Sequence, residues 1–166
     1  MHNELTKVDI AKMQEEIEER IALRPKLKEA VKAARDLGDL SENDEYRSAK
    51  REMNRNNSRI RYLENMIRTA VVISTESAEG EVGLFDEITI YYPEDEEERV
   101  IRIVTTLRND VFNDCISKES PVGKALLGHR VGETVTVHVK DGVQYPIEIR
   151  AIKKGEDDDT LPIAKY

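Results

Sequence analysis

The first half of the chain repeats its apolar residues with the period of two packed helices. Between residues 46 and 70 the steps alternate between three and four, which is typical of a coiled-coil seam with the members Tyr46, Ala49, Met53, Asn56, Ile60, Leu63, Ile67 and Ala70. The preceding stretch is rougher but similar, with Ile10, Met13, Ile17, Ile21, Leu27, Ala30, Val31 and Ala34. Pro25 lies inside it, so we expect a kink or a local break there.

Residues 35–45 carry the signals of a turn between these two helices. Gly38 can supply a left-handed helix end, and Ser41 can cap the start of the next helix. We therefore expect an antiparallel hairpin that turns near residues 38–41. Arms of about 30 residues would each be on the order of 45 Å long, at about 1.5 Å per residue.

After Ile73 the period of the apolar residues changes from that of a helix to that of a strand. Strands are predicted for the alternating segments 86–92, 98–106, 134–139 and 143–152. Asp141-Gly142, between the last two, is a strong hairpin signal. A short helix is predicted for residues 120–128, with Ser120 as its cap and Pro121 in its first turn.

These elements predict an α+β protein. It would consist of an N-terminal antiparallel coiled-coil hairpin (1–75, with its tip at 38–45), a small antiparallel-sheet domain with one short helix (76–155) and an acidic, disordered tail (156–166).

Composition and charge limit the cellular compartment and the partners that we expect for this protein. The single Cys115 fits a reducing compartment, and the apolar runs are too short to span a membrane. No signal peptide is visible, so we expect a cytoplasmic protein without membrane contact. Charge is uneven: residues 1–75 hold 15 Lys and Arg against 14 Asp and Glu, whereas the remainder holds 11 against 20. Such an acidic chain binds nucleic acid poorly in general, so any contact should be local or arranged by a protein partner.

The predicted tip, "ARDLGDLSENDEYRSAK", combines carboxylates with cations behind them. Helix-dipole effects explain Asp44 and Glu45, because both lie in the first turn of the second helix. The cations form a stripe at four-residue spacing beside Lys50, namely Arg47, Arg51, Arg55 and Arg59. In a hairpin turning near residue 40, its first members would lie opposite the like-charged Lys32 and Arg35, which favours an anionic partner there.

Carboxylates at a tip with cations behind them suit a phosphate-bound Mg²⁺, which accepts one or two protein carboxylates beside water and phosphate oxygens. Two carboxylates on a turn cannot build a two-metal site alone. They can complete one that another macromolecule has half built.

The segment "ARDLGDLSENDEY" resembles the signature of the bacterial GreA/GreB transcript cleavage factors, Ala-Arg-x-x-Gly-Asp-Leu-x-Glu-Asn-x-Glu-Tyr. "SPVGKALLG" followed by "VGETVTV" resembles the family's second block, and the resemblance covers about residues 5–153. It implies an FKBP-like second domain that docks on bacterial RNA polymerase. The hairpin would enter the secondary channel, where its tip helps hold a second Mg²⁺ so that the polymerase cleaves the 3′ end of backtracked RNA. The protein would be a cofactor to that reaction, a monomer, and not an enzyme by itself.

The resemblance also implies roles for single residues. Asp39 and Glu42 match the acids that help hold the shared Mg²⁺, which the isolated protein would not bind stably. Arg35 and Lys50 match contacts to the displaced RNA or the channel wall, and the neighbouring stripe members Arg47 and Arg51 are expected to join them. A further pair, Ser120 and Pro121, matches part of the polymerase-docking region, although a helix cap explains it at least as well.

Three positions depart from the family pattern. Asp44 stands where a small residue is usual, Asp9 where glycine is common, and residues 105–110 where a Gly-x-x-Glu-Ala-Asp-like segment is usual. The extra tip acid leaves open a Gre-like inhibitor of the same polymerase channel. A different class, a non-catalytic coiled-coil adaptor with a solvated turn, is the second alternative.

Overall fold

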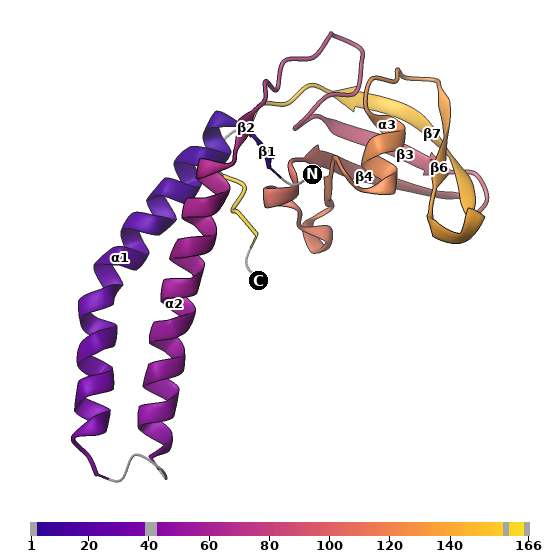
Figure 1. The fold of residues 1–166 in the computed structure, drawn as a ribbon. Coiled ribbons are helices and arrows are strands. Elements are labelled where there is room, and N and C mark those ends of the chain that lie inside the picture. The colour runs from indigo at the N-terminus through magenta and orange to yellow at the C-terminus, as the bar shows by residue number, and fades with distance from the viewer. Residues whose placement is uncertain (1–2, 39–42, 158–159, 165–166) are drawn as a thin grey trace. The chain divides into compact units, whose positions relative to one another are not determined.

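The structure is a computed structural model that describes residues 3–38, 43–157 and 160–164. The chain divides into two compact units (Figure 1), one of Ile10–Ala70 and the other of Met1–Asp9 with Val71–Tyr166. The N-terminal segment therefore groups with the C-terminal half of the sequence rather than with the hairpin that follows it.

Two antiparallel helices, α1 (Lys7–Arg35) and α2 (Asp44–Arg68), form the hairpin unit (Figure 1). All eight seam residues predicted on α2 and the segment after it are buried or half-buried, which confirms the seam. On α1 the pattern holds except at Ile21 and Ala30, which are exposed.

The break expected at Pro25 is wrong, because α1 continues through it. Proline has no N–H group to donate to the carbonyl four residues earlier, so one helical hydrogen bond is missing. Pro25 and Ile21 are both exposed, so water can satisfy that carbonyl.

Polar side chains join the two helices along the seam. Asn56, only 5% exposed, donates from Nδ2 to the Arg20 carbonyl at 3.0 Å and accepts from Arg20 Nη1 at 3.2 Å. Its amide is therefore satisfied inside the seam, which makes it a register-setting contact rather than a buried defect.

The other unit is built on a sheet in the order β5-β4-β3-β7-β6. Its strands are β3 (Glu87–Tyr92), β4 (Glu97–Val104), β5 (Cys115–Ser117), β6 (Thr134–His138) and β7 (Gln144–Lys153). Alternate positions of the central strands point into a core with α3 (Pro121–Leu126), and this core contains Val82, Ile88, Ile90, Ile101, Ile103, Leu126, Val135, Val137, Ile147 and Ile149. The predicted small domain with one short helix is therefore confirmed.

An antiparallel sheet was predicted, but the observed sheet is mixed. Strand β5 runs parallel to β4 and carries the buried Cys115. Between them the chain crosses over through two short 3-10 helices, η1 (Thr106–Arg108) and η2 (Val111–Asn113). This crossover reverses the direction that a tight hairpin would impose.

Local signals in the second half of the sequence hold. Strands β6 and β7 pair antiparallel around η3 (Lys140–Gly142), where Asp141 and Gly142 both have positive φ, 65° and 73°. Two successive left-handed residues match the twist of a β-hairpin. A two-stranded parallel pair, β1 (Glu4–Leu5) with β2 (Val71–Val72), was not predicted.

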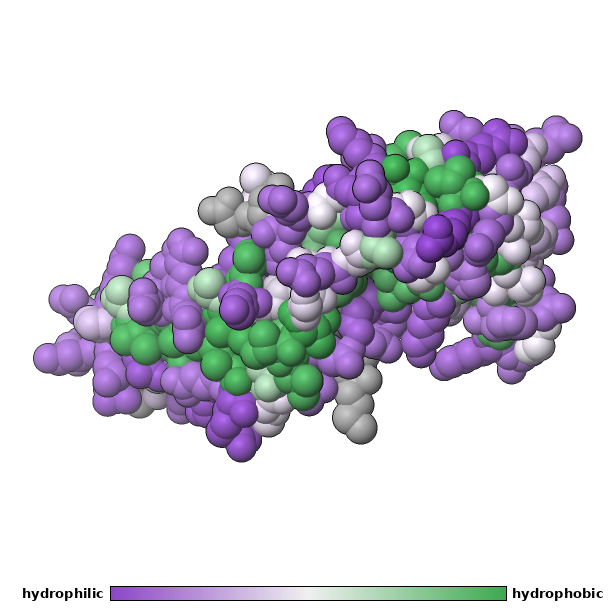
Figure 2. All heavy atoms as spheres, turned by 90° about the horizontal axis from the view of Figure 1, so that it is seen from above, coloured by the Kyte–Doolittle hydropathy of each residue, from purple (hydrophilic) through white to green (hydrophobic). Residues whose placement is uncertain are grey.

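Hydrophilic side chains surround separate hydrophobic patches on the face shown in Figure 2. Phe112, on η2, is fully exposed. Within the described residues, no helix has the length and apolar content needed to cross a membrane.

Candidate functional site

The predicted acidic tip lies between the C-terminal end of α1 and the N-terminus of α2. Asp39 and Glu42, the two candidate Mg²⁺ ligands, fall outside the described residues. On the α1 side the backbone tightens after Arg35, where the Leu37 N–H donates to the Ala34 carbonyl at 3.3 Å. Gly38 then adopts a φ of 133°, which a residue with a side chain rarely reaches.

Asn43 caps α2, not Ser41 as predicted. Its Oδ1 accepts from the Tyr46 N–H at 3.0 Å, and its carbonyl accepts from the Arg47 N–H at 3.2 Å. Ser41 lies two residues before this cap, outside the described residues. The sequence allowed either choice, because serine and asparagine are about equally good N-caps.

Behind the tip, Tyr46 gathers cations from both helices. The Arg35 guanidinium lies 5.8 Å from the centre of the Tyr46 ring, and Lys50 Nζ lies at the same distance. The hydrogen bond from Arg35 and the charge of Lys50 hold the pKa of the Tyr46 phenol below its usual range. The structure therefore brings together two predicted site residues, Arg35 and Lys50, through an aromatic ring that the sequence placed only in the seam.

A cavity of about 390 Å³ opens along α2 beside this cluster. Its lining consists of Tyr46, Arg47, Lys50, Arg51 and Asn54. Of the four cations predicted to contact RNA or the channel, Arg47, Lys50 and Arg51 thus share one surface with an aromatic ring, and Arg35 is the fourth. Guanidinium and ammonium groups bind phosphate, and aromatic rings stack on bases, so this surface suits a single strand of nucleic acid.

Arg59, the last predicted member of the basic stripe, does not belong to this surface. It is 4% exposed, and its Nε donates to Glu16 Oε2 at 2.7 Å across the hairpin. Burial alone would raise the pKa of Glu16, but hydrogen bonds from Arg59 and Arg20 outweigh it and lower that pKa. Arg59 directly precedes the seam residue Ile60, so its side chain lies at the seam, and its contact with Glu16 joins the two helices.

The predicted docking residues lie at the start of α3. Ser120 Oγ accepts from the Gly123 N–H at 3.0 Å and donates to the Ser117 carbonyl at 2.7 Å, while Pro121 occupies the exposed first turn. The predicted cap is confirmed. Gly123 is required for packing, because a Cβ there would meet the Ser117 carbonyl oxygen at 2.3 Å.

A buried charge cluster in the sheet unit was missed by sequence reasoning. Arg108 Nε lies 3.0 Å from Asp9 Oδ1, and Arg108 Nη1 lies 2.9 Å from Asp157 Oδ1. Asp9 Oδ2 also accepts from the Thr105 hydroxyl at 2.9 Å and from the Thr6 N–H at 2.9 Å. Burial raises the pKa of Asp9, opposed by those hydrogen bonds and by Arg108.

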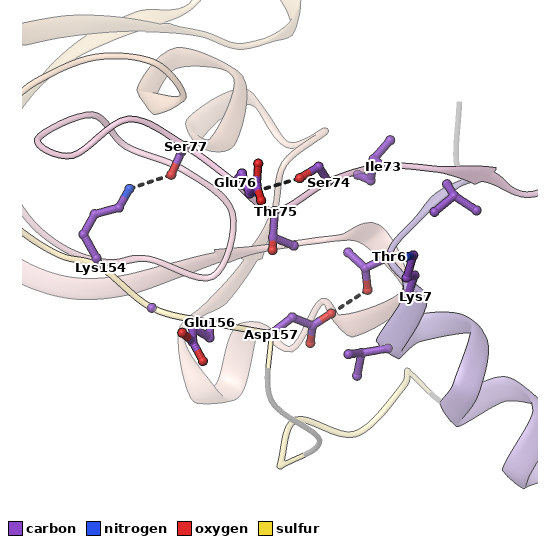
Figure 3. Close-up of a pocket in the computed structure, with 13 residues that line it drawn as sticks. Thr6, Lys7, Ile73, Ser74, Thr75, Glu76, Ser77, Lys154, Glu156 and Asp157 are labelled. Carbon is purple, nitrogen blue, oxygen red and sulfur yellow. Dashed lines mark hydrogen bonds between the residues drawn. The ribbon is translucent and has the colours of Figure 1, made fainter.

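This cluster adjoins a cavity of about 670 Å³ (Figure 3), on whose wall Asp157 accepts from the Thr6 hydroxyl at 2.5 Å. Its charges pair with each other, so the cluster holds the N-terminal segment, η1 and the tail together. Across the described part of the chain, no three His, Cys, Asp or Glu residues are grouped to hold a metal ion.

Comparison with known proteins gives the family. Residues 3–72 match the family model "Transcription elongation factor, N-terminal", and residues 76–154 match "Transcription elongation factor, GreA/GreB, C-term". The chain is 41% identical over 145 residues to the transcription elongation factor GreA of Limosilactobacillus fermentum, covering 86% of this chain and 91% of the relative. It is 40% identical over 151 residues to GreA of Geobacillus kaustophilus, covering 90% and 95%.

Among solved structures, the GreA factor homolog 1 of Thermus thermophilus is 26% identical, with 93% of this chain and 100% of that chain covered and a TM-score of 0.41. Both halves of the sequence match models of one family, and curated relatives match across most of their length. The chain therefore belongs to the GreA/GreB family of transcription elongation factors.

Proposed function

We propose that this protein binds bacterial RNA polymerase and stimulates the polymerase's own Mg²⁺-dependent cleavage of backtracked RNA. The observation that supports this most directly is the surface of Arg35, Tyr46 and Lys50, residues that flank in sequence the segment carrying Asp39 and Glu42. In this proposal the hairpin enters the secondary channel, and the released complex resumes elongation.

Asp39 and Glu42 would hold the shared Mg²⁺. Carboxylate oxygens are the donors that Mg²⁺ prefers, and one or two of them suffice where water and phosphate complete the shell. Asn43 donates to the Ala34 carbonyl at 2.6 Å, so the end of α1 and the residue that caps α2 lie close together. When bound, the ion would lower the pKa of a water and offset charge at the scissile phosphate.

The cations would handle the displaced RNA. Arg35 and Lys50, with Arg47 and Arg51, can neutralise backbone phosphates, and the Tyr46 ring offers a face to a base. None of these groups performs proton transfer in this proposal. They orient the RNA so that its 3′ end reaches the polymerase's catalytic centre.

The sheet unit, FKBP-like in this proposal, would dock on the polymerase through the surface around Ser120 and Pro121. Because the Ser120 hydroxyl is used within the α3 cap, Pro121 is the better candidate for direct contact. The protein would act as a cytoplasmic monomer, since one hairpin enters one channel.

One observation favours an inhibitor as the second candidate function. Asp44 is exposed in the first turn of α2, next to the cap Asn43. A third carboxylate beside Asp39 and Glu42 could capture Mg²⁺ in a geometry that blocks nucleotide addition. Replacing Asp44 with alanine would then relieve inhibition, whereas a cleavage factor would change little.

The deciding experiment adds the protein to a stalled, backtracked polymerase complex with end-labelled RNA. Wild type should shorten the RNA, and Asp39→Asn and Glu42→Gln should each slow cleavage about 100-fold or more, because a lost metal contact removes several kcal/mol of transition-state stabilisation. Both variants keep the side-chain shape, so they should still compete with wild type for the polymerase. Cleavage at the wild-type rate by both would reduce the acidic tip to an ordinary turn and favour the adaptor.

A further inference from the structure

The hydroxyl of Tyr46 receives cations from both arms of the hairpin. Arg35 is the last residue of α1, and Lys50 lies one turn after Tyr46 on α2. The guanidinium carbon of Arg35 and the Nζ of Lys50 each lie 5.8 Å from the centre of the Tyr46 ring. Both side chains also hydrogen-bond to the phenol group. One tyrosine side chain therefore joins cations that come from two different helices.

The contact is made at the hydroxyl rather than over the ring. A cation that interacts with an aromatic face lies within about 6 Å of the ring centre, so 5.8 Å is at the outer limit of that interaction. A phenol oxygen has two acceptor lone pairs and can accept from Arg35 and Lys50 together. The hydroxyl thus gathers the cations, and the faces of the ring stay available to a base.

Tyr46 is held more firmly than the two cations that it gathers. It is half-buried at a seam position, and its N–H donates to Oδ1 of the helix cap Asn43 at 3.0 Å. Arg35 and Lys50 are exposed, and such long side chains sample many rotamers in solution. A fixed acceptor limits where the ends of these two side chains lie.

The gathered charges lack a neutralising partner. Among the residues that the structure describes, neither Arg35 nor Lys50 forms an ion pair with a carboxylate. Two cations at one neutral oxygen repel each other, and an anion that contacts both removes this repulsion. Phosphate oxygens accept from guanidinium and ammonium groups, so a single phosphate can take hydrogen bonds from both.

We propose that Tyr46 is a positioning residue whose hydroxyl holds Arg35 and Lys50 together, so that the two cations bind one phosphate of the displaced RNA. This inference rests on the proposed function but makes a separate statement about these three side chains. The hydroxyl acts on the phosphate only through the cations. Stacking of a base on the ring does not need the hydroxyl, so the two roles of Tyr46 can be separated.

Removing the hydroxyl alone tests the proposal in the full-length protein. Tyr46→Phe keeps the ring, the seam packing and the backbone N–H that Asn43 caps. The matched control is Tyr62→Phe, which removes the hydroxyl of another tyrosine on α2, whose ring lies 5.4 Å from the Arg59 guanidinium. Both variants should melt like wild type and compete equally for polymerase that carries no RNA.

The two variants should differ in cleavage of backtracked RNA. Tyr46→Phe should be about 3- to 10-fold slower than wild type, the range expected for the loss of one hydrogen bond. Its rate should also depend less on salt concentration, because the cations engage the phosphate less often. Tyr62→Phe should match wild type in both respects. If Tyr46→Phe also matches wild type, the positioning role is wrong.

Combining substitutions separates positioning from direct contact. Adding Tyr46→Phe to a protein that already carries Arg35→Ala and Lys50→Ala should slow cleavage no further, because the hydroxyl then has nothing to hold. Equal slowing with and without the two cations would mean that the hydroxyl contacts the RNA itself, which overturns the proposal.

Titration of the Tyr46 phenol tests the contacts without any polymerase. The hydrogen bond from Arg35 and the charge of Lys50 hold the pKa of this phenol below its usual range. Carbon-13 NMR of the ring should therefore show a higher pKa in Arg35→Ala and in Lys50→Ala, and the wild-type pKa in the control Arg61→Ala. An unchanged pKa in the first two would show that the hydroxyl does not hold the cations. Failure of wild type to stimulate cleavage would instead refute the proposed function, and the titration would still decide whether Tyr46 gathers the cations.

Discussion

At the scale of single residues, two departures from the family pattern prove to be one. Asp9 stands where glycine is common, and residues 105–110 replace a Gly-x-x-Glu-Ala-Asp-like segment. The structure pairs them: Asp9 binds both Thr105 and Arg108, and the carboxylate and the guanidinium are both fully buried. Asp9 alone would leave a buried carboxylate without a cation, and Arg108 alone would keep only Asp157 as its acidic partner, so the two departures are explained together.

Removing one member of this buried pair should therefore lower the free energy of unfolding by more than the net contribution of the pair itself. We expect Asp9→Asn to lower the free energy of unfolding by about 3–5 kcal/mol, because Arg108 keeps its charge in a buried site. Arg108→Gln should cost a similar amount, and the double variant less than the sum of the two. Denaturant unfolding of all four proteins gives the coupling energy directly. Strict additivity would mean that Asp157 alone compensates Arg108.

At the scale of elements, the sequence predicted those elements that carry a local signal and missed those that only packing determines. The α2 seam, the four long strands, the Asp141-Gly142 turn and the α3 cap all carry local signals and were all found. The parallel strand β5 and the β1–β2 pair have only three and two residues, too short for a period to show. Contacts of the tail, such as Leu161 against the cluster of Phe85, Val104 and Cys115, depend on distant partners.

The candidate site divides in the same way. Arg47 and Arg51 were predicted because a four-residue spacing places them on one helix face, whereas Arg35 and Lys50 were predicted from the resemblance to the family motif. Arg59 was assigned wrongly, since spacing cannot show which edge of the stripe turns into the seam. The roles of Asn43 and Tyr46 could not be predicted, because both depend on the exact position of α1 beside α2.

The pairing of α1 with α2 should depend on pH through Glu16. Its folded pKa lies below the ordinary value, so its contribution to stability is present above the unfolded pKa and is lost as pH falls through the folded one. Stability of the hairpin should thus decline below about pH 4.5. Glu16→Gln should remove about 1.5–3 kcal/mol at neutral pH, through the lost charged hydrogen bonds. It should also flatten this part of the acid transition, which thermal melts followed by circular dichroism between pH 3 and 7 would measure.

At the scale of the whole molecule, the charge distribution assigns different tasks to the two halves of the sequence. The net charge is −8, yet residues 1–75 carry a balance of +1, and three of their cations, Arg47, Lys50 and Arg51, line one cavity behind the tip. A protein of this charge should not bind RNA tightly by itself, since the phosphates would be repelled. RNA contact should therefore arise only where polymerase has already positioned the strand.

Cleavage should therefore depend on the charges of the surface behind the tip and not on the net charge of the protein. Replacing Arg35 and Lys50 with alanine takes the net charge from −8 to −10 and removes both cations from the Tyr46 ring. Charge-assisted contacts contribute about 1.5–3 kcal/mol each, so cleavage of backtracked RNA should slow at least tenfold and depend less on salt. The matched control is Arg61→Ala with Arg68→Ala, an equal change in charge at two exposed residues that hydrogen-bond to Ser58 and Asn65 of their own helix. That pair should cleave like wild type, as measured by cleavage rate against salt concentration, with circular dichroism confirming that both double variants fold. Equal losses in the two double variants would mean that overall charge, rather than the surface behind the tip, governs the interaction with polymerase.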